Sequence, residues 1–257
     1  MRSTQSNHSR GGFKIIHLAL LVTITTLLFP MAALAAPPSP LDPASVGARS
    51  LANLHYIIFI VAALVFLVVG ALLSYSLVRF QRKSENEPQP DQNFPGNPKL
   101  EIIWTAAPIL ILMVLLALTF QTLNDIGLDN HPAGLTIRVT GKQWVWEVNY
   151  PEYNLNLMGE LRVPVNQDIK IELTSQDVIH SFWVPRLGER QEAIPGYLTT
   201  TWFRAGQEGT YPGECAEYCG LAHSNMVLKV IVLDQNSFDI WLADQTRQQV
   251  SAPATTN

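Results

Sequence analysis

Two long stretches of apolar residues without charge dominate the first half of the chain. Residues 57–78 carry no charged side chain, and residues 102–124 form a second uncharged run. A helix needs about 20 mostly apolar residues to cross the hydrocarbon core of a bilayer. The pattern therefore predicts transmembrane helices over residues 51–81 and 101–124, joined by a cytoplasmic loop over residues 82–100.

A third apolar run, at the N-terminus, has the features of a secretory signal. Arg2, Arg10 and Lys14 precede an uncharged run over residues 15–30, and Ala33-Leu34-Ala35 supplies a small-x-small triplet for cleavage. Residues 1–35 are therefore predicted to be a signal peptide, followed by a proline-rich linker over residues 36–50. A retained third helix is the alternative, because the run is long for a signal.

Beyond residue 131 the apolar residues recur with a period of two. They alternate with polar residues over 135–139 and 169–173, and residues 227–233 form a further β-branched run. Such segments, separated by turn pairs such as Pro195-Gly196, are typical of an antiparallel sandwich or barrel. We expect one all-β domain over residues 131–245, with a short helix over 238–247 near its end, and a disordered tail over 246–257.

The distribution of charge agrees with a membrane protein. Charged residues make up only 15% of the chain, against about 25% in soluble domains. Lysine and arginine gather in the loop between the two predicted helices, so this loop is cytoplasmic and both ends of the hairpin lie outside. From residue 131 onward nine basic and fourteen acidic residues give a net charge of −5, which argues against nucleic acid as a partner.

The candidate chemistry is concentrated in one segment near the end of the β domain. Cys215, Cys219, His223 and Met226 follow one another at intervals of four, four and three residues. His180 lies upstream, at the end of a predicted strand, and loops at one end of a sandwich bring it within reach of this segment. Thiolate, imidazole and thioether together form a soft ligand set, which copper favours.

Three other uses of these residues remain open from spacing alone. A Cys215–Cys219 disulfide is feasible in an exported domain. A zinc site of two cysteines and two histidines leaves Met226 and Glu217 without a role. A mononuclear blue-copper site needs a single cysteine, whereas the second thiol present here is enough to bridge a second metal ion.

In combination, these residues resemble cytochrome c oxidase subunit II. The resemblance covers residues 50–245 and includes the helical hairpin, Gly141-Lys142-Gln143-Trp144-Val145-Trp146, the His180 motif and the Cys215–Met226 segment. It implies a cupredoxin-like Greek-key barrel that carries a dinuclear copper A centre. The implied ligands are Cys215 and Cys219 bridging both coppers, His180 and Met226 on one copper, and His223 and the backbone carbonyl of Glu217 on the other.

The resemblance also implies roles outside the copper ligands. Trp144 would be the point where electrons enter, while Trp146 packs in the core, and their spacing of two suggests that one strand face carries both. Asp177 and Glu192 would form a donor-docking face, together with Glu147 or Glu189. Without the resemblance, each of these acids is simply a solvated surface group.

Two further carboxylates acquire roles by the same resemblance. Glu217 would reach a magnesium ion at the boundary with subunit I, since hard oxygen ligands suit that ion, although it could equally order its loop by hydrogen bonding. Glu101 would be the mouth of a proton channel into subunit I. The plain interpretation of Glu101 is an acid favoured at a helix N-terminus.

The expected function is that of a membrane-anchored oxidase subunit. It accepts electrons at the outer, periplasmic or lumenal, side of a bacterial-type membrane and relays them to haem, which only subunit I holds, for oxygen reduction coupled to proton pumping. Gln176, Asn149 and Tyr197 depart from the usual docking pattern, so the donor is left open between a c-type cytochrome and a plastocyanin-like copper protein. The rivals are subunit II of a quinol oxidase, which lacks copper, and a copper carrier.

Overall fold

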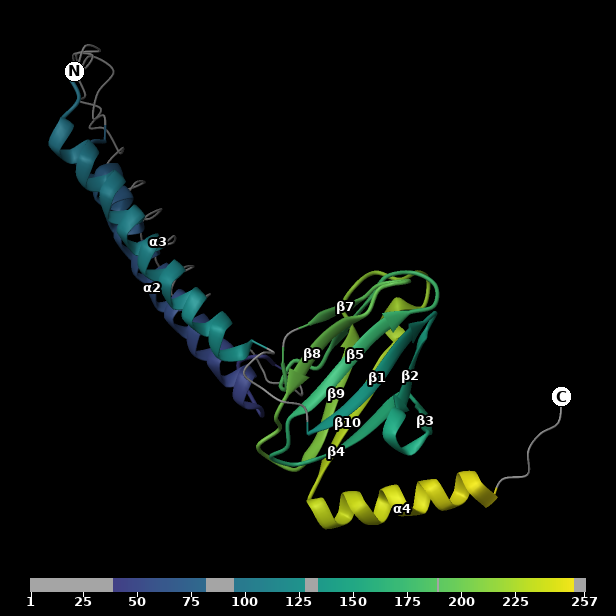
Figure 1. The fold of residues 1–257 in the computed structure, drawn as a ribbon. Coiled ribbons are helices and arrows are strands. Elements are labelled where there is room, and N and C mark those ends of the chain that lie inside the picture. The colour runs from purple at the N-terminus through teal and green to yellow at the C-terminus, as the bar shows by residue number, and fades with distance from the viewer. Residues whose placement is uncertain (1–38, 82–94, 128–133, 189, 252–257) are drawn as a thin grey trace, which may run out of the picture. The chain divides into compact units, whose positions relative to one another are not determined.

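Two long helices precede a β domain in the computed structural model, which describes residues 39–81, 95–127, 134–188 and 190–251 (Figure 1). Helix α2 (Val46–Arg79) and helix α3 (Pro98–Ile126) are both long and apolar enough to span a bilayer. The central turns of both helices expose apolar side chains, as a lipid environment requires. The expected pair of spanning helices is confirmed, while the predicted signal peptide lies outside the described residues.

Both helices begin at a side-chain cap that the charge pattern did not reveal. Ser45 Oγ accepts a hydrogen bond from the backbone N–H of Ala48 (3.0 Å), so α2 begins at Val46 and residues 46–50 of the predicted linker are helical. Asn97 Oδ1 accepts from the N–H of Lys99 (3.1 Å), and α3 begins at Pro98 rather than at residue 101. Capping residues satisfy N–H groups that have no partner within the helix, which is why these boundaries precede the apolar runs.

The β domain consists of two five-stranded sheets (Figure 1). One sheet has the order β3-β2-β1-β5-β8 and the other β4-β10-β9-β6-β7. Their strands are β1 (Leu135–Lys142), β2 (Val145–Tyr150), β3 (Leu155–Met158), β4 (Glu160–Pro164), β5 (Ile169–Ser175), β6 (His180–Trp183), β7 (Gln191–Ala193), β8 (Thr199–Phe203), β9 (Gly209–Cys215) and β10 (Val227–Leu233). Short 3₁₀ turns lie at Pro151–Tyr153 and His223–Asn225.

The sheets are mixed, not antiparallel throughout as the alternating pattern suggested. β1 pairs with β5 in parallel, and β10 pairs with β4 in parallel, while the other strand pairs are antiparallel. The chain passes from the first sheet to the second between β3 and β4, and β5 then returns beside β1 in the same direction. The all-β expectation is confirmed, but the strand direction was wrong, because alternation reports which face is buried and not which way a neighbour runs.

The space between the sheets is filled by alternate residues of each strand. These side chains are almost completely buried and nearly all apolar, among them Ile137, Val139, Trp146, Val148, Leu161, Ile171, Leu173, Phe182 and Val230. Tyr150 joins the two sheets with its hydroxyl, which donates to the Arg162 carbonyl (2.8 Å) and accepts from the Arg162 N–H (2.7 Å). This rigid core holds the loops at the end of the domain in fixed positions.

The chain ends in helix α4 (Gln235–Ser251), which contacts β3 and β4 (Figure 1). Phe238 and Leu242 are buried, and the Arg162 guanidinium stacks 5.2 Å from the centre of the Trp241 ring. Helix α4 is longer than the helix predicted over residues 238–247 and extends into the tail predicted over residues 246–257. Residues 246–251 are helical rather than part of a tail, and residues 252–257 lie outside the described residues.

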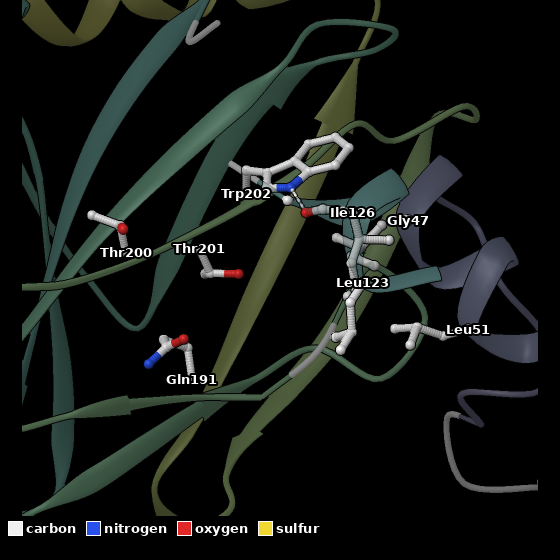
Figure 2. A pocket seen from close by; sticks show the side chains of 11 residues that line it. Gly47, Leu51, Leu123, Ile126, Gln191, Thr200, Thr201 and Trp202 are labelled. Carbon is white, nitrogen blue, oxygen red and sulfur yellow. Dashed lines mark hydrogen bonds between the residues drawn. The ribbon is translucent and has the colours of Figure 1, made fainter. Parts of the chain in front are cut away.

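Hydrogen bonds join both spanning helices to the β domain within one unit of residues 38–257. Ser45 forms a bridge with Ala205, and its hydroxyl donates to the Leu187 carbonyl (2.5 Å). Figure 2 shows the indole N–H of Trp202 donating to the Ile126 carbonyl (2.6 Å) at the end of α3, beside a cavity of 230 Å³. The start of α2 and the end of α3 therefore lie on the same side as the β domain, as the predicted hairpin requires.

Candidate metal centre

Five of the six predicted donors are held at the loop between β9 and β10: Cys215, the Glu217 carbonyl, Cys219, His223 and Met226. Cys215 is the last residue of β9 and Met226 immediately precedes β10, and the Cys215 N–H donates to the Met226 carbonyl (3.0 Å) across the base of the loop. Within the loop, the N–H of His223 donates to the Gly220 carbonyl (3.1 Å). The backbone therefore fixes where the thiols, the imidazole and the thioether lie.

His180 reaches this loop from the adjacent strand of the same sheet. It is the first residue of β6, whose Phe182 pairs with Cys215 of β9, and the Ala216 N–H donates to the Ser181 carbonyl (2.9 Å). The prediction that His180 joins the loop is confirmed, but the expected route was wrong. His180 begins a strand rather than ending one, and it approaches along the sheet rather than across the sandwich.

The donor atoms of the loop and of His180 lie within a few ångströms of one another. Cys215 Sγ lies 3.9 Å from Cys219 Sγ, 3.9 Å from His180 Nδ1 and 3.2 Å from the Glu217 carbonyl oxygen. Cys219 Sγ lies 3.5 Å from His223 Nδ1 and 3.7 Å from Met226 Sδ. All six predicted donors therefore meet at one place.

The two cysteines are free thiols and do not form the alternative disulfide. Their sulfurs are 3.9 Å apart, nearly twice the length of an S–S bond of about 2.05 Å. A metal–thiolate bond is about 2.3 Å long, so one ion fits between the two sulfurs and binds both. A structural zinc site has four ligands, whereas six donors, including a thioether and a carbonyl, converge here. The donor set fits copper better than zinc.

Most of the side chains in this cluster are buried, which affects their protonation. His180, Cys215, Cys219 and Met226 are all buried. Burial, together with the neighbouring Cys215 thiol, raises the pKa of Cys219 to about 11. Cys219 is therefore protonated near neutral pH in the metal-free chain, and metal binding releases its proton because the thiolate is the ligand.

Asp177 binds the outer nitrogen of His180, a contact that the sequence interpretation missed. Its Oδ1 accepts a hydrogen bond from His180 Nε2 (2.8 Å), which leaves Nδ1 free to face Cys215. Burial acts to raise the pKa of Asp177, but hydrogen bonds from the Gln143 N–H, His180 and the Val178 N–H outweigh it and lower this pKa. A carboxylate that orients a ligating histidine is a recurrent feature of metal sites. The Asp-x-x-His spacing was the signal available in the sequence.

His180 is also held in place by packing. A methyl group added at Gly141 of β1 would lie 2.6 Å from His180 Cδ2 and 2.9 Å from Cγ, so only glycine fits there. The Trp146 ring lies against the imidazole at an edge-to-face angle, with 5.8 Å between ring centres. The imidazole therefore has one available position.

The two tryptophans of the aromatic motif do not share a strand face. β2 begins at Val145, so Trp146 lies in the strand and is fully buried, as expected for core packing, whereas Trp144 lies in the preceding turn and is partly exposed. The Trp144 Nε1–H donates to the Cys219 carbonyl (3.1 Å), and the Gln143 side-chain amide donates to the same oxygen (2.8 Å). Trp144 thus connects the surface to a donor residue.

The other predicted site residues lie outside the donor cluster. Glu101 is in the first turn of α3, where an acid favours the helix dipole. Glu192 on β7 lies 4.0 Å from Arg190, Glu147 is paired with Lys142 (2.6 Å), and the Glu217 side chain is exposed. Glu189 is outside the described residues. The structure brings together the donors and Asp177, but none of these other acids.

Comparisons with known proteins agree with the geometry of the site. A family model described as "Cytochrome C oxidase subunit II, periplasmic domain" matches residues 155–233, and one described as "Cytochrome C oxidase subunit II, transmembrane domain" matches residues 41–122. A probable cytochrome c oxidase subunit 2 from Rickettsia felis is 32% identical over 227 residues, which cover 80% of this chain and 70% of the relative. The chain belongs to the cytochrome c oxidase subunit II family.

A second relative and the domain of a solved structure are also similar to parts of this chain. Cytochrome c oxidase subunit 2 of Alkalihalophilus pseudofirmus is 35% identical over 222 residues, covering 84% of this chain and 64% of the relative. The crystal structure of the periplasmic domain of subunit II from Bradyrhizobium japonicum is 34% identical, with a TM-score of 0.44, and covers 46% of this chain and 96% of that one.

Membership of the cytochrome c oxidase subunit II family confirms the main expectations from the sequence. The chain is a membrane-anchored oxidase subunit with two spanning helices and a C-terminal periplasmic domain. The family, together with the candidate metal-binding group of His180, Cys215 and Cys219, supports copper binding by this chain.

Proposed function

We propose that this subunit accepts single electrons from a soluble carrier in the periplasm and passes them through a dinuclear copper A centre to haem in subunit I. Oxygen reduction and proton pumping take place in subunit I. The observation that carries this proposal is the convergence of six donors, including two free thiols 3.9 Å apart, at the end of the β domain. A quinol oxidase subunit would not need this set.

The neighbours of each thiol support a bridging arrangement. Cys215 Sγ lies near His180 Nδ1 and the Glu217 carbonyl, and Cys219 Sγ lies near Met226 Sδ and His223 Nδ1. If one copper takes His180 and Met226 and the other takes His223 and the Glu217 carbonyl, each thiol lies beside one donor of each copper. With Cys215 and Cys219 as shared ligands, all six donors would have a place at a copper pair.

The protein contributes rigidity to this chemistry. When bound, the copper pair holds one electron shared between two ions. His180 is fixed by Asp177 and Gly141, and the loop is closed at its base by the Cys215–Met226 hydrogen bond. Ligands that cannot move keep the energy of reorganisation small when the charge changes.

Trp144 is proposed as the residue where electrons enter. We expect Trp144→Phe to leave copper content and spectrum unchanged but to slow reduction of the copper-loaded full chain by a soluble c-type cytochrome. The Phe side chain keeps a ring but loses the N–H that donates to the Cys219 carbonyl. We expect a slowing of about tenfold, which corresponds to an increase of about 1.4 kcal/mol in the barrier to electron transfer. Stopped-flow reduction in detergent, with metal analysis, measures both.

Trp202→Phe is the matched control for this experiment. It also removes an indole N–H that donates to a backbone carbonyl, but at Ile126, outside the donor cluster. An equal rate in the Trp144 variant and the unmodified chain would reject the role of Trp144. A copper content other than two per chain would reject the dinuclear centre itself.

Asp177 is proposed to orient His180, a role separate from the donor docking expected from the sequence. Asp177→Asn is expected to weaken copper binding by about 10- to 100-fold, the usual cost of losing an outer partner of a ligand. Asp177 accepts hydrogen bonds on both oxygens, from Gln143 N–H and from His180, and an amide must place its NH₂ against one of these donors. Copper affinity is measured by competition with a chelator.

The control for Asp177 is Asp234→Asn. Asp234 also accepts a backbone N–H, from Ser237 at 3.0 Å, at the start of α4. Unchanged copper affinity in the Asp177 variant would show that His180 does not depend on this carboxylate.

Three further roles rest on the family. Glu217 is proposed to reach a magnesium ion at the boundary with subunit I. Its backbone carbonyl faces the Cys215 thiol, whereas its side-chain carboxylate is exposed. Glu101 is proposed as the mouth of a proton channel, at the cytoplasmic end of α3. Glu192 remains a candidate for donor docking.

A further inference from the structure

The two histidines of the donor cluster are held in different ways. His180 is completely buried, its Nε2 is bonded to Asp177 (2.8 Å), and the Trp146 ring packs against it. His223 is partly exposed, and its Nδ1 faces Cys219 Sγ at 3.5 Å. Among the residues that the structure describes, no group forms a hydrogen bond with the other ring nitrogen of His223. The orientation of this imidazole must therefore come from a different kind of contact.

The backbone around His223 fixes the position of its Cα atom but not that of its ring. The His223 N–H donates to the Gly220 carbonyl, and the Met226 N–H donates to the His223 carbonyl, both at 3.1 Å. These bonds hold the short 3₁₀ turn His223–Asn225 in place. The imidazole still has a choice of side-chain rotamers. A partly exposed ligand that turns outward would leave its copper open to water.

The Tyr218 ring packs against the His223 imidazole and limits this rotation. The two ring centres are 5.8 Å apart, and the ring planes meet at 62°. This is an edge-to-face pair at a distance that aromatic rings favour. Tyr218 is 75% exposed, so its ring does not serve the hydrophobic core of the domain. Its contact with a donor residue is what the structure offers to explain its position.

Gly220 allows the loop to bring these two rings together. Its φ of +117° lies in the region that favours glycine, and it is the first residue of the turn that the His223 N–H closes. A methyl group added here would lie 3.0 Å from Gln143 Nε2 and 3.3 Å from Trp144 Cζ2. The turn is therefore packed closely against its neighbours, and the loop has little freedom to separate Tyr218 from His223.

We propose that Tyr218 is a positioning residue for His223, whose imidazole it keeps turned toward Cys219. This inference rests on the proposed function and adds a residue to it. The outer contacts of a metal ligand affect both the affinity for the metal and its electronic properties. Without the Tyr218 ring, His223 can turn away and weaken the ligation of one copper. The shared electron is then distributed less evenly over the copper pair.

The experiment compares Tyr218→Leu and Tyr218→Phe with the unmodified full chain, each loaded with copper in detergent. We expect Tyr218→Leu to bind copper about two- to tenfold more weakly in competition with a chelator, the range that one aromatic pair contributes. Its electron paramagnetic resonance spectrum should show less even copper hyperfine splitting. Tyr218→Phe keeps the ring and should match the unmodified chain in both measurements. Tyr75→Leu is the control, since exposed Tyr75 forms a similar edge-to-face pair with Phe80 (6.3 Å) at the far end of α2.

Three outcomes overturn the inference. Unchanged affinity and spectrum in Tyr218→Leu would show that His223 keeps its position without the ring. Equal changes in Tyr218→Phe and Tyr218→Leu would assign the effect to the hydroxyl group. A lower unfolding temperature of the metal-free Tyr218→Leu chain would make Tyr218 a structural residue of the loop. All three leave the proposed function intact, because that function fails only if the unmodified chain binds no copper pair or if reduction does not depend on Trp144.

Discussion

Replacing Cys219 with serine is expected to abolish the dinuclear copper centre. Cys219 Sγ lies 3.9 Å from Cys215 Sγ, 3.5 Å from His223 Nδ1 and 3.7 Å from Met226 Sδ, so it touches donors of both proposed copper ions. A serine hydroxyl is a hard donor that stays protonated at neutral pH and does not bridge two soft metal ions. The loss should exceed the roughly 10- to 100-fold cost of removing an outer partner of a ligand.

Metal analysis and electron paramagnetic resonance of the full chain in detergent measure this effect. The unmodified chain should hold two coppers and show one unpaired electron shared between two copper nuclei, whereas the Cys219→Ser variant should hold at most one copper and show no sharing. Met226→Leu removes a single thioether and should keep both coppers while shifting their potential. Ser224→Ala, an exposed change in the same loop, is the control. A shared electron that survives Cys219→Ser would refute the bridging role.

Adding one methyl group at Gly141 is expected to have the second largest effect. In Gly141→Ala the new carbon would lie 2.6 Å from His180 Cδ2 and 3.2 Å from His180 Cβ. The imidazole cannot retreat, because it is fully buried and the Trp146 ring packs against it. His180 must therefore turn away from Cys215, and we expect copper binding to fall by more than tenfold, while overpacking itself costs about 1–3 kcal/mol of stability.

Copper affinity and thermal unfolding of the full chain separate these two effects. Gly206→Ala is the matched control, since a methyl group there would lie 3.7 Å from the Ala44 carbonyl, an ordinary contact. Both properties should change in the Gly141 variant and neither in the control. Normal copper affinity in the Gly141 variant would show that the His180 ring is not fixed by this contact.

The sequence predicted that the donor side chains meet, because most of them are close together in the chain. Cys215, Cys219, His223 and Met226 lie within one loop, so their spacing alone places them near one another. The sequence predicted that His180 reaches this loop, but not that it does so from the neighbouring strand. The pairing of β6 with β9 cannot be seen in either segment alone. The contact between Asp177 and His180 was missed because it depends on how the turn before β6 folds.

The fold was predicted as far as local patterns extend. Uncharged runs revealed both spanning helices, but their true starts depend on the caps Ser45 and Asn97, which lie outside those runs. The spacing of Trp144 and Trp146 suggested a shared face, which fails because the strand begins between them, at Val145. Parallel pairing of β1 with β5 depends on the path of the chain between the sheets, which no periodicity records.

The bridge between Ser45 and Ala205 constrains the biogenesis of this subunit. Its two residues flank the spanning hairpin, one before α2 and one after β8. They meet only after translocation has delivered both flanks to the same compartment. A molecule in which only one of the two helices spans the membrane leaves the Leu187 carbonyl without the Ser45 hydroxyl and uncovers the surface on which Ala44 packs. These contacts can therefore be completed only after both helices have crossed the membrane.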